Sequence, residues 1–196
     1  YVLGDGNDTF TQAAGNGNDT ITGGAGRDTY NGAANDGDDD FIFTAISDSG
    51  AGGTAGGTTA APTFTNTFDI FAAGSITAGD EIDISAVSQS LAGNTLAADE
   101  LTGRTNVAVA TANTFAAIQT AVANQLTASS TGANSTIGVN LINVGAGAAV
   151  GSYLILNNSN TVLDSGDMMF EIQGADQAAI NTLADAFITA TELAFA

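Results

Sequence analysis

The sequence contains no cysteine and no histidine, and none of its 196 residues is a lysine or a tryptophan. Without histidine or cysteine, the chain cannot assemble a Ser-His-Asp triad, a thiol nucleophile or a histidine-ligated zinc site. Without cysteine it forms no disulfide, so stability must come from packing or from another kind of cross-link. Paired carboxylates at Asp99–Glu100 or Asp164–Asp167 are the remaining acid/base candidates, but sequence neighbours do not flank a substrate bond. We therefore expect that the chain is not an enzyme.

Positive charge is almost absent. Arg27 and Arg104 oppose 21 acidic residues, which leaves a formal net charge of −19. This balance disfavours nucleic acid and anionic membrane surfaces as partners, because both require basic residues. Eight of the acidic residues lie within the first 40, where crowded carboxylates repel one another unless a cation neutralises them. Divalent metal ions are the partners that this distribution favours.

Long apolar runs are also missing. No run approaches the roughly 20 residues that span a bilayer, so we expect no membrane insertion. The N-terminus lacks the basic and then apolar pattern of a secretory signal peptide, so export would require a different kind of signal. Nevertheless 44% of the residues are hydrophobic, which is enough for a buried core in one domain or two small ones.

A short phrase recurs four times near the start of the chain. In each copy a Gly is followed two residues later by an Asp, and two residues after that by a large apolar residue. The copies are LGDGNDTFT (3–11), AGNGNDTIT (14–22), GGAGRDTYN (23–31) and ANDGDDDFI (34–42). Glycine permits unusual backbone angles, aspartate presents oxygen and the apolar residue is suited to burial, so each phrase predicts a loop followed by a strand. Such a loop suits a hard cation.

The spacing of the apolar positions predicts how the phrases stack. From Phe10 to Ile21, Tyr30 and Phe41, the steps are eleven, nine and eleven residues. If each phrase is half of a coil, a full coil takes 20 residues and alternate phrases stack on the same side. Tyr1 stands nine residues before Phe10, so we expect the chain to begin inside a repeat of a longer polypeptide.

This pattern resembles the nonapeptide repeat of RTX proteins, which form a calcium-binding parallel β-helix or β-roll. The resemblance implies a β-roll over residues 1–46, with calcium between stacked turns. One ion would lie near Asp8 and Asp28, and another near Asp19 and Asp39. Backbone oxygens around Gly4, Gly6, Gly15, Gly17, Gly24, Gly26 and Gly37 would complete the ligand shells. Asp36, Asp38, Asp39 and Asp40 crowd the last turn, and which of them ligate stays open. Ordinary Asp/Gly turns explain this composition but not its repeated register.

Beyond the repeats, residues 47–62 are rich in glycine and are expected to form a loop. Residues 63–87 resemble the strands that follow the repeats in serralysin-like secreted proteins, with DEIDIS at 80–85. Asp69, Asp80 and Asp83 are weak ligand candidates, and solvated strand edges or turns are the favoured explanation for them. Residues 88–112 are expected to be loop with short strands around Val107 and Val109.

The remaining segments predict a β-rich closing domain over 63–196. Strands are expected at 136–144, 151–158 and 167–174, and amphipathic helices near 113–126 and 176–187. Asp164 and Asp167 suit either a cation or an Asx turn. The C-terminal TELAFA loosely resembles an uncleaved type I export signal.

The sequence therefore predicts a mainly β protein, a parallel β-roll followed by a β-rich domain with two short helices. The expected function is a calcium-dependent structural module of a secreted or cell-surface bacterial protein, of the surface-layer or matrix type. Calcium would drive folding and assembly after type I export. The expected partners are calcium ions, the type I secretion apparatus, the upstream part of the same polypeptide and further copies at the cell surface. The alternative is the folding and secretion module of a type I-secreted protease or lipase, whose catalytic domain would lie upstream.

Overall fold

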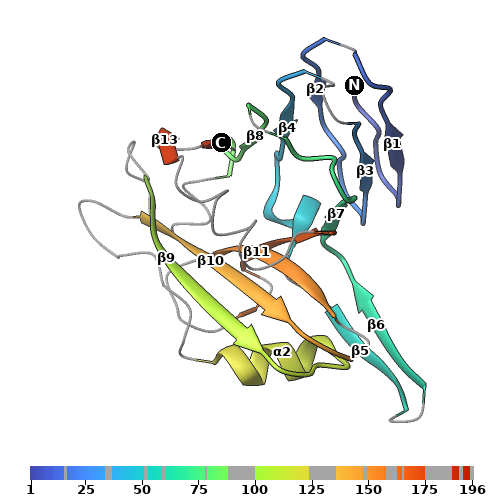
Figure 1. Ribbon diagram of the computed structural model, residues 1–196, viewed down its shortest axis with the longest axis vertical. Helices are drawn as coiled ribbons and strands as arrows, with labels where there is room; N and C mark the ends of the chain where they lie inside the picture. The colour runs from blue at the N-terminus through green and yellow to red at the C-terminus, as the bar shows by residue number, and fades with distance from the viewer. Residues whose placement is uncertain are drawn as a thin grey trace.

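A computed structural model describes most of the chain (Figure 1). The described residues are 1–15, 17–33, 37–50, 53–58, 61–77, 79–87, 100–123, 136–147, 150–157, 163–164, 166–174, 187–189 and 192–194. Within these residues the protein consists mainly of strands in parallel and mixed sheets, with one α-helix. The expectation of a mainly β fold is confirmed at this level.

The first, third and seventh strands stack in parallel at one end of a seven-stranded sheet. They are β1 (Thr9–Thr11), β3 (Thr29–Asn31) and β7 (Asp69–Phe71). Phe10 pairs in register with Tyr30, and Tyr30 with Phe71. All three side chains are buried because inward-facing residues of parallel strands cover one another.

The second, fourth and eighth strands stack in the same way in a second, five-stranded sheet. They are β2 (Thr20–Ile21), β4 (Asp40–Ile42) and β8 (Glu81–Asp83). Ile21 pairs with Phe41, and Phe41 with Ile82. The predicted pairing of alternate phrases is therefore confirmed. We call β1 with β2 the first layer, β3 with β4 the second layer, and β7 with β8 the third layer.

The seven-stranded sheet continues from the third layer into the C-terminal half of the chain. Its further strands, in spatial order, are β12 (Met168–Ile172), β11 (Gly151–Asn157), β10 (Thr136–Val144) and β9 (Glu100–Val109). β10, β11 and β12 confirm the three predicted strands. The short strands expected within 88–112 were wrong in extent, because β9 pairs with β10 along its length and this pairing outweighs the weak local propensity.

The five-stranded sheet ends in two short strands from the C-terminal region. β14 (Glu192–Ala194) pairs antiparallel with β8, and β13 (Phe187–Thr189) pairs with β14. Phe187 was predicted to end a helix and instead begins β13, so its backbone hydrogen bonds lie between strands. The rest of the helix expected at 176–187 lies outside the described residues.

The helix predicted near 113–126 is confirmed as α2 (Phe115–Val122). The Thr114 hydroxyl accepts a hydrogen bond from the Ala117 N–H at 3.1 Å, which caps the first turn. Ile118 and Val122, one turn apart, are fully buried in a core cluster with strands β10 and β11. In the part of the chain that the structure describes, no helix is long and apolar enough to cross a membrane.

The glycine-rich stretch 47–62 is not a plain loop. The 3₁₀ helix η1 (Ile46–Ser49) leads into a hairpin of β5 (Gly53–Thr58) and β6 (Ala61–Asn66), which pair antiparallel and extend away from the stacked layers (Figure 1). Glycine is depleted in strands, so its abundance predicted a loop. The pairing of the two segments overrides that preference, because each strand satisfies the backbone polar groups of the other.

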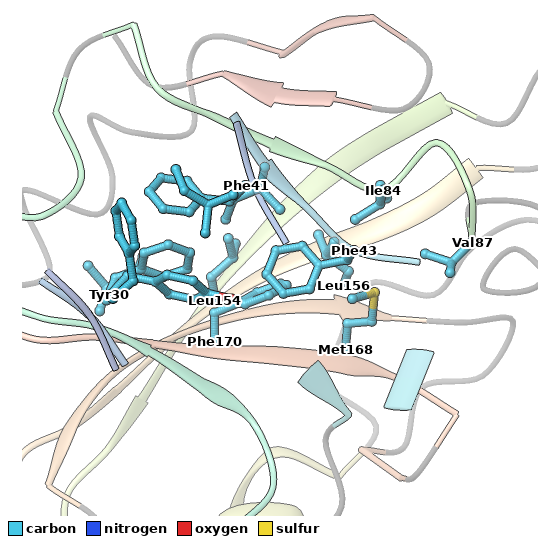
Figure 2. Packing of buried hydrophobic residues seen from close by; sticks show 14 of the residues in the cluster. Tyr30, Phe41, Phe43, Ile84, Val87, Leu154, Leu156, Met168 and Phe170 are labelled. Atoms are coloured by element: carbon cyan, nitrogen blue, oxygen red, sulfur yellow. The ribbon is translucent and has the colours of Figure 1, made fainter. Parts of the chain in front are cut away.

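One hydrophobic cluster joins the stacked layers to the C-terminal strands. Figure 2 shows Tyr30, Phe41, Phe43, Leu154 and Phe170 in this cluster. The ring of Phe71 lies 5.0 Å from that of Tyr30, 4.9 Å from Phe41 and 6.1 Å from Phe170, measured between centroids. The stacking thus continues past the predicted boundary at residue 46, and Phe71 connects both parts of the core.

Replacing Phe71 by Ala is expected to destabilise the fold by about 3–5 kcal/mol, because removing the ring leaves a cavity where the two parts of the core meet. Urea unfolding followed by circular dichroism measures the change. Val150 is 56% exposed, so Val150→Ala serves as the control and is expected to shift stability by less than about 0.5 kcal/mol. Similar values for the two variants would contradict the central position of Phe71.

Candidate metal centre

The predicted ligands Asp8 and Asp28 belong to a ladder that runs through the three layers of the seven-stranded sheet. The Asp8 N–H donates to Asp28 Oδ1 at 2.9 Å, and the Asp28 N–H donates to Asp69 Oδ1 at 2.8 Å. Each carboxylate therefore accepts a hydrogen bond from the aspartate one layer earlier. Asp28 and Asp69 are completely buried. These bonds help to fix the register of the layers, since each one joins a defined pair of residues in successive layers.

The five-stranded sheet repeats this ladder with the other predicted pair. The Asp19 N–H donates to Asp39 Oδ1 at 2.9 Å, and the Asp39 N–H donates to Asp80 Oδ1 at 2.9 Å. Asp39 and Asp80 are buried at 2% and 0% exposure. The structure therefore brings together Asp8 with Asp28 and Asp19 with Asp39, as the sequence predicted.

Asparagine side chains tie the turns together in the opposite direction. Asn7 Oδ1 accepts the Arg27 N–H at 3.0 Å, and Asn18 Oδ1 accepts the Asp38 N–H at 3.1 Å. Asn7 and Asn18 each stand one residue before a ladder aspartate. Aspartates thus reach toward the preceding layer and asparagines toward the following one.

The glycines of the first and third phrases allow their turns to lie directly on one another. The Gly4 N–H donates to the Gly23 carbonyl at 3.0 Å, and the Gly6 N–H donates to the Ala25 carbonyl at 2.7 Å. Gly26 has φ +140°, and a Cβ there would collide with the Gly6 carbonyl oxygen. A side chain at that position would therefore part the turns.

Two carboxylate oxygens beside these turns lack hydrogen-bond partners within the described residues. They are Asp8 Oδ2 and Asp28 Oδ2, and both atoms are buried. A Cβ added to Gly23 would collide with both Asp28 Oδ2 and the Tyr30 hydroxyl, so only glycine fits beside this oxygen. A buried carboxylate oxygen without a donor is costly, and a cation is one group that removes the cost.

Burial sets the electrostatics of the ladder. It raises the pKa of Asp28; the Asp8 N–H lowers this pKa, and the charges of Asp8 and Asp48 raise it further. Burial likewise raises the pKa of Asp69 to about 8, partly offset by the hydrogen bond from the Asp28 N–H. The pKa of Asp80 is raised by burial, against the hydrogen bonds from Thr77 and Asp39. A divalent cation beside these groups would reverse the trend, because it favours the ionised form.

The donor set fits calcium better than a softer metal. The available atoms are carboxylate oxygens and backbone carbonyl oxygens, and calcium takes oxygen ligands in a flexible shell. Among the described residues, no three His, Cys, Asp or Glu side chains converge as a metal cage. The loop carbonyls would accordingly supply much of the shell around the Asp8–Asp28 pair.

The other predicted ligands differ in their surroundings. Asp36 lies outside the described residues, and so does Asp99 of the acid/base pair considered from the sequence. Asp83 is half-buried, and its Oδ1 accepts the Ser85 N–H at 2.7 Å. Asp167 is buried and accepts hydrogen bonds from Asn157 Nδ2 at 3.1 Å and from the Asp164 N–H at 2.8 Å. Asp164 Oδ1 accepts the Gly166 N–H at 2.7 Å, which is the bond expected of an Asx turn.

The burial of Asp69 and Asp80 was not predicted from the sequence. Solvated edges or turns were the favoured explanation, and the structure instead buries both carboxylates as the third layer of the two ladders. A signal was present, because Asp69 and Asp80 are eleven residues apart, like Asp8 and Asp19. The glycine that precedes each earlier aspartate by two residues is replaced by Thr67 and Ala78, so the motif was hidden.

Comparisons with protein-family models, with curated proteins and with solved structures give no significant match.

Three glycine substitutions distinguish the stability cost of a positive φ angle from the cost of a clash between an added Cβ and the neighbouring turn. Gly26→Ala is expected to cost at least about 2 kcal/mol, because it combines positive φ with a clash. Gly6 has φ +122° but open space at its Cβ, so Gly6→Ala is expected to cost about 1–2 kcal/mol. Gly17 has neither feature, and Gly17→Ala is expected to change stability by less than about 0.5 kcal/mol. Thermal unfolding measures the series, and equal losses would contradict the stacked turns.

Proposed function

We propose that this chain is a calcium-dependent structural module of a secreted or cell-surface bacterial protein, of the surface-layer or matrix type. In this proposal residues 1–46 and the third layer form a parallel β-roll that holds calcium between stacked turns. The observation that carries the proposal is the pair of buried oxygens, Asp8 Oδ2 and Asp28 Oδ2, which have no hydrogen-bond partner among the described residues. The oxygen-rich glycine turns beside them support it.

The residues that would hold calcium come from successive layers. The Asp8 and Asp28 carboxylates, with backbone oxygens around Gly4, Gly6, Gly24 and Gly26, would form one site. Asp19 and Asp39, with backbone oxygens around Gly15, Gly17 and Gly37, would form another. When bound, calcium supplies positive charge to the buried carboxylates and cross-links the turns. The aspartates and asparagines of this chain meanwhile fix the layers in register through their hydrogen bonds to the backbone.

Coupling between calcium and folding follows from the charge of the chain. Eight acidic residues within the first 40 repel one another in the absence of a cation, and a ligand that binds only the folded stack stabilises it by mass action. Calcium is scarce inside cells and abundant outside. We therefore propose that the chain folds after type I export and then assembles with further copies, or with the rest of its polypeptide, at the cell surface.

Calcium is expected to stabilise the protein after treatment with EGTA. At about 100 times the dissociation constant, each independent site adds about 2.7 kcal/mol, which raises the melting temperature and increases the β signal in circular dichroism. Magnesium is the matched control, and we expect a smaller effect because it requires tighter octahedral geometry and loses water reluctantly. A melting curve that does not respond to calcium would exclude the proposal.

Asp28→Asn is expected to weaken calcium binding by at least about tenfold, because it removes a charge and the open oxygen. The Asn oxygen can still accept the Asp8 N–H, so the ladder is retained. Asp5 is exposed in the first turn, and Asp5→Asn removes the same charge from the surface. Isothermal titration calorimetry compares the two variants. If both lose affinity equally, general electrostatic attraction rather than a built site explains the binding.

A further inference from the structure

Asp69 occupies the same ladder position as Asp28 but has different partners. Both carboxylates are completely buried, and each accepts a backbone N–H from the preceding layer through Oδ1. Asp28 Oδ2 has no hydrogen-bond partner within the described residues, whereas Asp69 Oδ2 accepts the Tyr30 hydroxyl at 3.0 Å. In the part of the chain that the structure describes, the Oδ2 atom of the ladder aspartate therefore lacks a hydrogen-bond donor in the second layer and has one in the third.

The donor is a tyrosine at a position where the adjoining layers carry phenylalanine. Phe10 and Phe71 flank Tyr30 in register, and Figure 2 shows Tyr30 within the buried cluster. Its ring packs on those of Phe71 and Phe41, with centroids 5.0 Å and 5.1 Å apart. Burial raises the pKa of the Tyr30 hydroxyl, so it remains a donor at neutral pH. A buried tyrosine hydroxyl needs a partner, and Asp69 supplies it.

In the five-stranded sheet, different groups donate hydrogen bonds to the third-layer carboxylate. Asp80 Oδ1 accepts the Asp39 N–H, and Asp80 Oδ2 accepts the Thr77 N–H at 2.6 Å and the Thr77 hydroxyl at 3.2 Å. Both third-layer carboxylates thus have protein donors on both oxygens. This agreement between two unrelated donors, Tyr30 and Thr77, argues against a chance contact.

We propose that the Tyr30 hydroxyl ends the array of calcium sites in the seven-stranded sheet by occupying the Asp69 oxygen that a further ion would need. The inference rests on the proposed function, because it assigns calcium to the Asp8–Asp28 pair and excludes it from the Asp28–Asp69 pair. Tyr30 acts as a positioning residue, and its hydroxyl does for Asp69 what a cation does for an open carboxylate. Removing this hydroxyl converts the Asp28–Asp69 pair into an additional calcium site.

Tyr30→Phe tests the proposal in the full chain, and the residue introduced is the one that the adjoining layers use. Without calcium, the variant is expected to melt at a lower temperature than wild type, because Asp69 Oδ2 loses its donor. With saturating calcium, the difference is expected to shrink, and native mass spectrometry is expected to count one more ion than in wild type. Tyr153→Phe controls for the loss of a buried hydroxyl and is expected to leave the ion count unchanged.

Asp69→Asn provides a second test that does not depend on the tyrosine variant. Because Asp69 holds no ion in this proposal, Asp69→Asn is expected to bind as many calcium ions as wild type, whereas Asp28→Asn binds fewer. An unchanged ion count in Tyr30→Phe, or a lost ion in Asp69→Asn, would overturn the inference while calcium binding by wild type stands. A wild-type protein that binds no calcium would overturn the proposed function itself.

Discussion

The fold depends on one repeated hydrogen bond, from the backbone N–H of each ladder aspartate to the carboxylate of the aspartate one layer further on. It links Asp8 to Asp28 and Asp28 to Asp69 in one sheet, and Asp19 to Asp39 and Asp39 to Asp80 in the other. Strands of two or three residues have few ladder bonds of their own, so a carboxyl acceptor in the second and third layers adds a fixed point of register. The inward rings of Tyr30, Phe41 and Phe71 then pack because the register is set.

Much of this stacking was predictable, because it follows from the spacing of the apolar residues rather than from the composition. The alternation of nine and eleven residues placed Phe10 on Tyr30 and Ile21 on Phe41, and the structure pairs them so. A one-residue shift would turn every inward side chain outward, so the pattern leaves little freedom. The same spacing brought together the aspartates of the candidate metal centre. Spacing thus predicted both the inward-facing residues of the stacked strands and the pairing of these aspartates.

The parts that sequence reasoning missed depend on contacts between distant segments. The third layer is separated from the second by the hairpin 53–66, and Asp69 follows Phe68 rather than a glycine turn. Strand β9 and the hairpin exist because partners pair with them along their length, which local propensity does not report. The hydroxyl of Tyr30 meets Asp69 across 39 residues, and only the fold reveals that contact.

The two oxygens of a ladder carboxylate have different partners. In the second and third layers one oxygen accepts a backbone N–H, a role that an asparagine oxygen could also fill. The other oxygen is closed by Tyr30 or Thr77 in the third layer and is open on Asp28 in the second. A buried charge is tolerated when donors surround it and is costly when they do not. Among the described residues of the seven-stranded sheet, the third-layer carboxyl therefore has protein donors on both oxygens, whereas Asp8 Oδ2 and Asp28 Oδ2 in the earlier layers have none.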